Sequence, residues 1–155
     1  MYTINIPPGL GREYSHMAWQ KITRKGSPQL SLKEKFGMPF DPDGIGCIDG
    51  RKVIACTPKF GKIGDAVCVK LQNGDEFHAI IGDYKNENDA DCNEWGHKYG
   101  KCVVEFVVDI RKGWLGYNGN KRAVTVLPYL KNNPVAKIQN LALNCIKSIY
   151  QDVSG

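Results

Sequence analysis

Four apolar runs in close succession decide the fold: RKVIACTP (residues 51–58), DAVCVKL (65–71), EFHAIIGDY (76–84) and CVVEFVVD (102–109). They are rich in β-branched and aromatic residues and are bounded by turn residues, a pattern typical of strands. Asn73-Gly74 separates the second run from the third and predicts a two-residue hairpin, because both residues tolerate positive φ. We therefore expect a sheet centred on this part of the chain.

Three acidic residues stand at or near the ends of these runs. The third run ends at Asp83 and Tyr84, and the fourth carries Glu105 and Asp109. The loop from Lys85 to Lys101 connects the two runs and is rich in Asn, Asp and Gly. Acids at strand ends beneath a long loop are the main functional clue in the sequence.

The length of 155 residues predicts one domain over residues 1–155, large enough to bury its own core. The net charge is +5, and the densest basic group is Lys21, Arg24 and Lys25. Such a group can serve an anionic partner, such as a wall polymer or nucleic acid. The alternative is a solvated basic surface, and we expect the latter.

No apolar run approaches the roughly 20 residues that a membrane-spanning helix needs. The residues from Met1 to Pro7 lack the basic and apolar regions of a signal peptide. We therefore do not expect an ordinary secretory precursor, and no membrane partner is expected.

The six cysteines show no C-x-x-C spacing, which argues against zinc-ribbon and thioredoxin sites. Cys47 and Cys92 fall in predicted loops, and we expect reduced thiols rather than a bridge between them. The other four are flanked by apolar residues and are predicted to be small core side chains: Cys56, Cys68, Cys102 and Cys145.

Two helices are predicted outside the strand block. Ser27 as N-cap, Pro28 at the first position and Gly37 as the stop predict a surface helix. In the tail, apolar residues recur at three- and four-residue spacing, which predicts an amphipathic helix over about 133–151. Tyr14 to Ile22 fits either a short helix or a strand.

The elements together predict a mainly β fold of the α+β type. We expect a small barrel of about six strands over residues 45–128, including a strand from Arg122 to Leu127, with helices confined mainly to the ends of the chain.

The segment KFGKIGDAVCVKLQNGDEFHAIIGDYK (59–85), followed by GKCVVEFVVD (100–109), resembles the double-psi β-barrel modules of rare lipoprotein A, of the barwin and expansin group, and of the "3D" lytic transglycosylases. Those modules share a glycine turn, an Asn-Gly hairpin and two strands that each end in an acid. The matching segments here are Ile63-Gly64-Asp65, Leu71 to Gly74, Ile80 to Asp83, and Val103-Val104-Glu105.

The resemblance covers about a third of the chain and has two departures. Glu105 stands where the family usually has Asp, and Tyr84-Lys85 replaces the residues that usually follow the first acid. The flanking segments look like small proteins encoded near lysis and tail genes of phages of Gram-positive bacteria. This resemblance implies a location in a phage particle or release by lysis, and otherwise the cytoplasm.

The resemblance implies binding of peptidoglycan or another polysaccharide and, in some members, non-hydrolytic cleavage of the glycan strand. Asp83 would then be the general acid and base, with Glu105 as its electrostatic partner. The predicted substrate-binding residues are His97, Trp95, Tyr99, Tyr84 and Asp109. No cofactor and no metal is expected. The alternative function is a non-catalytic cell-wall-binding or structural component of a phage particle.

Several other interpretations compete with these roles. Asp83 can be a loop cap that binds backbone amides, and Glu105 can face water on an edge strand. His97 can be an exposed loop histidine. Paired with Cys92 it hints at a cysteine hydrolase, and with Asp89, Asp91 and Cys92 it gives a metal-ligand set of unusual spacing. The acidic loop between the runs argues against nucleic acid binding.

Overall fold

Ten strands form one mixed sheet in this computed structural model, which describes residues 1–110 and 127–146. The strands are β1 (Tyr2–Asn5), β2 (Glu13–Ala18), β3 (Cys47–Ile48), β4 (Arg51–Cys56), β5 (Asp65–Leu71), β6 (Glu76–Tyr84), β7 (Cys92–Asn93), β8 (Gly96–His97), β9 (Cys102–Val108) and β10 (Val135–Asn144). The helix α1 (Pro28–Phe36) and three short 3-10 turns, η1 (Trp19–Lys21), η2 (Pro58–Phe60) and η3 (Lys98–Gly100), complete the described elements.

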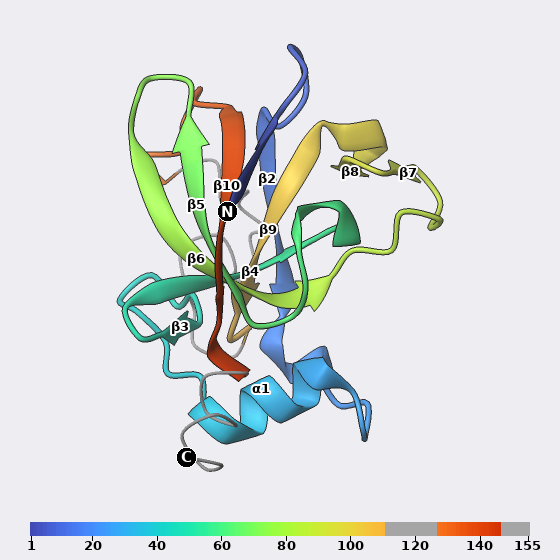
Figure 1. Cartoon of the computed structure of the whole chain (residues 1–155), viewed down its shortest axis with the longest axis vertical. Coiled ribbons are helices and arrows are strands. Elements are labelled where there is room, and N and C mark those ends of the chain that lie inside the picture. Colours follow the sequence, from blue (N-terminus) through green and yellow to red (C-terminus); the bar gives the residue numbers. More distant parts are fainter. Residues whose placement is uncertain (111–126, 147–155) are drawn as a thin grey trace.

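The sheet is strongly curled, and β4 lies near its middle (Figure 1). The strand order is β1-β10-β5-β6-β4-β9-β8-β7, with β2 added to β9 and β3 added to β4. Most neighbours are antiparallel, but β4 runs parallel to β6 and β2 runs parallel to β9. The mainly β class is therefore confirmed, with ten strands where about six were expected.

The four predicted runs form β4, β5, β6 and β9, and the predicted hairpin joins β5 to β6. Its loop has three residues rather than two, because the amide of Leu71 still donates to the carbonyl of Asp75 at 2.8 Å. Only Gly74 has positive φ, at 95°, and the amide of Gly74 closes the turn on Leu71. A three-residue loop with glycine in the left-handed position is also a common hairpin connection.

The core is built from aliphatic side chains around Phe106, which is fully buried in β9. Its ring centroid lies 5.6 Å from that of Phe77 in β6 and 6.2 Å from that of Tyr14 in β2. Tyr14 reaches the carbonyl of Asn133 with its hydroxyl at 2.7 Å, which satisfies the polar end of a buried ring.

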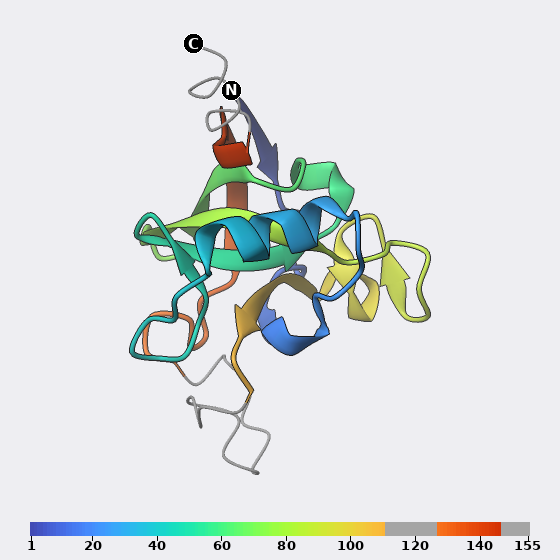
Figure 2. The same ribbon diagram turned by 90° about the horizontal axis from the view of Figure 1, so that it is seen from below.

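The first predicted helix is confirmed at both ends. The Ser27 hydroxyl accepts from the amide of Leu30 at 3.1 Å, and Gly37 ends the helix at φ 63°. These are the N-cap and the left-handed C-cap that the sequence predicts. α1 packs against β6 at one end of the sheet through the fully buried Leu32 (Figure 2).

The second predicted helix, over 133–151, is wrong for residues 135–144, and only residues 145 and 146 of its described part are helical. Residues 135–144 form β10, between β1 and β5. A register shift between Val135 and Lys137 places the next buried side chain at Ile138, three residues later. This bulge gives a strand the spacing of a helix face, because an inserted residue breaks the strict alternation of a strand.

Three other expectations concern Tyr14, the predicted strand from Arg122 to Leu127, and the cysteines. Tyr14 lies in a strand, β2, rather than in a helix. The predicted strand from Arg122 to Leu127 lies outside the described residues except for its last residue. All six cysteines are free, and the half-buried Cys47 and Cys92 lie in the short strands β3 and β7 rather than in loops.

No helix in residues 1–110 or 127–146 is long and apolar enough to cross a membrane.

Candidate functional site

Asp83 and Glu105 lie on either side of Ala55, the fifth residue of β4. Ala55 pairs with Asp83 across the parallel β4–β6 ladder and with Glu105 across the antiparallel β4–β9 ladder. Paired residues on neighbouring strands project from the same face of a sheet. The two carboxyl side chains therefore flank the small methyl group of Ala55, which leaves space between them.

A β-bulge places Asp83 in this row. Ile54 pairs with Ile81 but Ala55 pairs with Asp83, so the ladder skips Gly82. A Cβ at Gly82 would lie 2.3 Å from Cγ1 of Val53, closer than real Cβ contacts allow. Glycine at this position therefore permits β6 to bend close to β4 and turn the next residue toward the site.

Asp83 is half-buried and held by two donors. Its Oδ1 accepts from the amide of Tyr84 at 2.8 Å, and the side chain of Gln29 in α1 also hydrogen-bonds to it. Burial raises the pKa of Asp83 above its ordinary value, and the two hydrogen bonds offset part of that rise. The backbone bond fits the loop-cap interpretation, but Gln29 comes from a different element and is no part of a local cap.

Glu105 is buried, with 9% of its surface exposed, and every residue of β9 is buried. β9 is an interior strand, flanked by β4, β2 and β8, so Glu105 does not face water on an edge strand. Burial raises the pKa of Glu105, the cation Lys85 lowers it, and the charge of Asp83 raises it again. The two carboxyls thus lie close enough to interact, and together they retain a proton to higher pH than isolated acids do.

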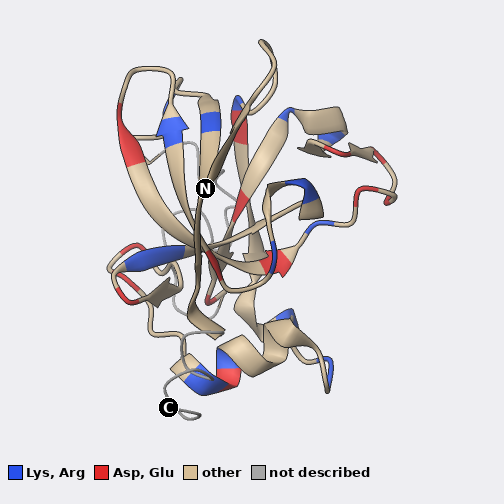
Figure 3. Cartoon of the chain, viewed as in Figure 1, with Lys and Arg blue, Asp and Glu red and all other residues tan. Residues whose placement is uncertain are grey.

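A surface pocket of about 580 Å³ opens at Asp83. Asp83, Tyr84 and Gln29 form one side, and the segment before α1 forms the other with Lys21, Arg24 and Lys25. Figure 3 shows this basic segment beside the first turn of α1. Glu105 does not line the pocket, so Asp83 is the carboxyl of the pair that a ligand there can reach.

The long loop places His97 beside the start of β9, where it pairs with Cys102. Cys92 in β7 pairs with His97 in β8, and the Sγ to Nδ1 distance is 3.8 Å. Burial, Lys85 and Lys98 lower the pKa of His97, so it is neutral at physiological pH. Burial raises the pKa of Cys92, Lys85 lowers it, and the charges of Asp89, Glu105 and Asp91 raise it further. A thiol with a raised pKa lacks the activation that a cysteine hydrolase needs.

The aromatic residues predicted to bind substrate are dispersed. Trp95 packs on Phe60, with ring centroids 6.3 Å apart, and Lys59 lies over its ring at 4.5 Å. Tyr99 is 62% exposed and not held by the core. Tyr84 is half-buried and lines the pocket at Asp83, and its hydroxyl donates to the carbonyl of Gly61 at 3.2 Å.

Asp109 does not join the pair, although it follows the same strand as Glu105. It is 1% exposed and accepts from the side-chain amide of Gln20. Four residues of strand separate the two acids, which is about 13 Å. Asp109 therefore holds η1 against the end of β9 rather than facing the pocket.

A second pocket, of about 740 Å³, lies on the other side of Tyr84, which lines both. Its polar wall is a fixed network in which Asn140 and Asn144 of β10 donate to the two carboxylate oxygens of Asp65, at 3.0 and 2.8 Å. Reasoning from the sequence missed this wall, because it assigned these asparagines to a helix.

Lys85 and Gln29 are the other residues that the sequence analysis did not select for the site. Lys85 affects the pKa of Glu105, Cys92 and His97, so it is the central cation of the loop. The sequence could have indicated Lys85, because it directly follows the strand that ends in Asp83 and Tyr84. Gln29 carried no signal, because its contact with Asp83 depends on how α1 packs against β6.

His97, Asp89, Asp91 and Cys92 were considered as possible metal ligands, but they do not form a cluster. Within the described residues, one group of three possible ligands lies close together, and it belongs to the β5–β6 hairpin instead.

No family model matches the chain, and neither the curated proteins nor the solved structures contain a match.

Proposed function

We propose that the protein is a peptidoglycan-directed double-psi β-barrel protein that cleaves glycan strands as a lytic transglycosylase. The observation that carries the proposal is the acid pair, Asp83 and Glu105, on either side of Ala55. One acid opens to a pocket, and the other is buried behind it. This asymmetry suits a proton donor with an electrostatic partner.

The strand connections support the barrel type. β4 and β6 lie side by side and parallel, and the chain between them forms β5, which lies on the far side of β6. β2 likewise lies parallel to β9, with β4 between β9 and β6. Looped connections between parallel neighbours are compatible with a double-psi barrel.

The proposed chemistry needs one carboxyl in two protonation states. Protonated Asp83 donates its proton to the glycosidic oxygen as the bond to C1 of the sugar breaks. The resulting carboxylate accepts the proton of the C6 hydroxyl as O6 bonds to C1 and closes the 1,6-anhydro ring. No water is consumed, and Asp83 ends protonated as it began.

Burial at Asp83 favours the protonated starting state. Burial and the neighbouring charge both oppose full ionisation of two acids in one row. Glu105 does not line the pocket and is assigned the part of electrostatic partner, because the charge of Asp83 raises its pKa. The basic wall formed by Lys21, Arg24 and Lys25 suits a polymer that carries carboxylates, as peptidoglycan does.

The test is to incubate the protein with Gram-positive peptidoglycan and analyse the soluble products by mass spectrometry. We expect anhydro-muropeptides from the unaltered chain and a loss of at least about 100-fold with Asp83→Asn, the lower range for a general acid–base group. Asp75→Asn is the matched control, since Asp75 is exposed in the β5–β6 loop. Equal cleavage by Asp83→Asn would remove Asp83 from the mechanism.

A second candidate function is a non-catalytic wall-binding or structural component of a phage particle. The observation that favours it is Lys85, whose charge lowers the pKa of Glu105 and so opposes retention of a proton by the pair. This function predicts that the protein sediments with insoluble peptidoglycan and releases no products. Sedimentation that is weakened by charge reversal at Lys21 and Arg24 would then assign the basic pocket to binding.

A further inference from the structure

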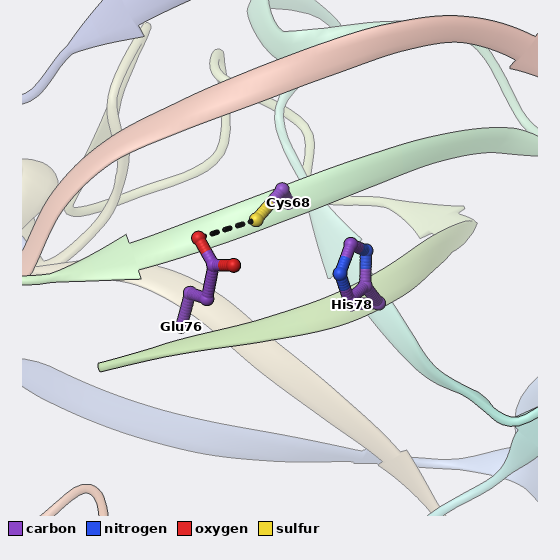
Figure 4. Close-up of side chains that lie close together, drawn as sticks. All are labelled: Cys68, Glu76 and His78. Atoms are coloured by element: carbon purple, nitrogen blue, oxygen red, sulfur yellow. Dashed lines mark hydrogen bonds between the residues drawn. The ribbon is translucent and has the colours of Figure 1, made fainter. Parts of the chain in front are cut away.

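Three metal-ligating side chains meet on the β5–β6 hairpin. Cys68 of β5 lies directly opposite His78 of β6, so both side chains project from the same face. Glu76 precedes His78 by two residues and therefore shares that face. Figure 4 shows the Glu76 carboxylate turned toward the thiol of Cys68, with the imidazole beside them. Five residues of β6, about 16 Å, separate His78 from Asp83.

The ligand atoms have the spacing that a tetrahedral ion requires. All three lie within 4.8 Å of one another, and Cys68 Sγ lies 3.3 Å from Glu76 Oε2. Tetrahedral zinc with a thiolate at about 2.3 Å and an oxygen at about 2.0–2.2 Å places those two atoms roughly 3.5 Å apart. Small side-chain rotations would bring the set to that geometry, since Glu76 and His78 are exposed.

We propose that Cys68, Glu76 and His78 bind one zinc-like divalent cation, with the fourth position open to water. The donor set of one sulfur, one nitrogen and one oxygen favours Zn²⁺ or Co²⁺ over Mg²⁺ and Ca²⁺, which prefer oxygen ligands. Binding replaces the S–H to carboxylate hydrogen bond by two metal bonds, and the thiol proton passes to the solvent. The proposal is independent of glycan cleavage.

Two neighbouring cations, Lys70 and Arg51, oppose the metal ion. The ammonium of Lys70 lies 3.8 Å from Glu76 Oε2 and competes for the same carboxylate. Both side chains are largely solvated, so this ion pair is weak and gives way to a metal that holds three ligands. Removing the Lys70 charge should therefore tighten metal binding several-fold.

The chain offers a matched control in a second cross-strand pair of cysteine and histidine. Cys92 and His97 face each other across β7 and β8 as Cys68 and His78 do across β5 and β6. No third ligand completes the Cys92–His97 pair within the described residues. His97 also pairs with Cys102 across β8 and β9, so cysteine and histidine stand in register three times, and the carboxylate distinguishes the proposed site.

The experiment is a titration of the full chain with Co²⁺, followed by absorption spectroscopy and competition with Zn²⁺. We expect one equivalent to bind, with a thiolate-to-cobalt charge-transfer band that Cys68→Ser abolishes. His78→Gln should weaken binding by at least about 100-fold, because loss of a direct ligand exceeds the 10- to 100-fold cost of losing an outer partner. Glu76→Gln should weaken binding at least 10-fold, and Lys70→Gln should strengthen it.

The double variant Cys92→Ser/His97→Gln should retain the band and the affinity. The proposal is overturned if this double variant loses the band while Cys68→Ser keeps it, or if the unaltered chain shows no thiolate band at millimolar Co²⁺. Glu76 and His78 are exposed, so their variants fold and remain informative even if Cys68→Ser does not. Circular dichroism of each variant verifies the fold.

Discussion

Asp83 and Glu105 are both register partners of Ala55, one on each side of β4. Two strand spacings, about 9–10 Å, separate their backbones. The side chains approach each other across the methyl group of Ala55, and the charge of Asp83 raises the pKa of Glu105. The width of the residue at position 55 therefore controls how strongly the two acids interact.

Ala55→Leu tests this control. Ala55 is 1% exposed, so a larger side chain must push into the space between the acids or into the core. We expect a loss of stability of about 1–3 kcal/mol from overpacking and a smaller rise in the pKa of Glu105. Denaturant unfolding and NMR titration of the Glu105 carboxyl measure the two effects. An unchanged pKa in a folded variant would contradict the arrangement.

Glu105→Gln should stabilise the fold at neutral and alkaline pH. The folded-state pKa of Glu105 is raised, so the folded chain binds its proton more tightly than the unfolded chain does. That contribution is fully present below the unfolded pKa and is lost as pH rises through the folded pKa. A glutamine side chain does not ionise, so the free energy of unfolding of the variant should fall less between mildly acidic and neutral pH. Glu87→Gln, in the exposed loop, is the control.

Lys85→Met should shift the pH dependence of glycan cleavage. The proposed mechanism needs a protonated acid, so the rate falls as pH rises through the raised pKa of the pair. Since Lys85 lowers the pKa of Glu105, removing its charge should move that fall to higher pH. The pH–rate profile measures the shift. The exposed Lys101→Met should leave the profile in place, and an equal shift in both would indicate a general charge effect.

Ser27→Ala should cost about 0.5–2 kcal/mol, because the Ser27 hydroxyl caps α1 at the amide of Leu30. The effect should reach the site, since Gln29 in the first turn of α1 holds Asp83. Ser27→Asp keeps an acceptor at the cap and should retain most of the stability. Thermal melting of both variants separates loss of the cap from loss of the residue itself.

The sequence was sufficient where local chemistry alone determines structure. Ser27, Pro28 and Gly37 specify α1 by backbone rules that need no knowledge of the rest of the fold. The four apolar runs likewise predict β4, β5, β6 and β9, because each is a continuous or alternating strand pattern. Asp83 and Glu105 could be selected for the same reason, as acids at or within such strands.

Prediction failed where pairing over long distances determines structure. β10 has the spacing of a helix face because a bulge opposite β5 shifts its alternation, and only the partner strand reveals that bulge. The contact between Gln29 and Asp83 joins residues 54 positions apart and leaves no local trace. The same holds for Asn140 and Asn144, whose acceptor Asp65 lies more than 70 residues earlier in the chain.

The position of β10 has a consequence for synthesis on the ribosome. β10 lies between β1 and β5, and Asn140 pairs with Tyr2 on one side and Val67 on the other. Among the described strands, β1 therefore has no partner until β10 emerges, on the order of 10 s later at typical elongation rates. Until then β5 has an open edge, and the nascent chain is most exposed to mispairing with other copies during that interval.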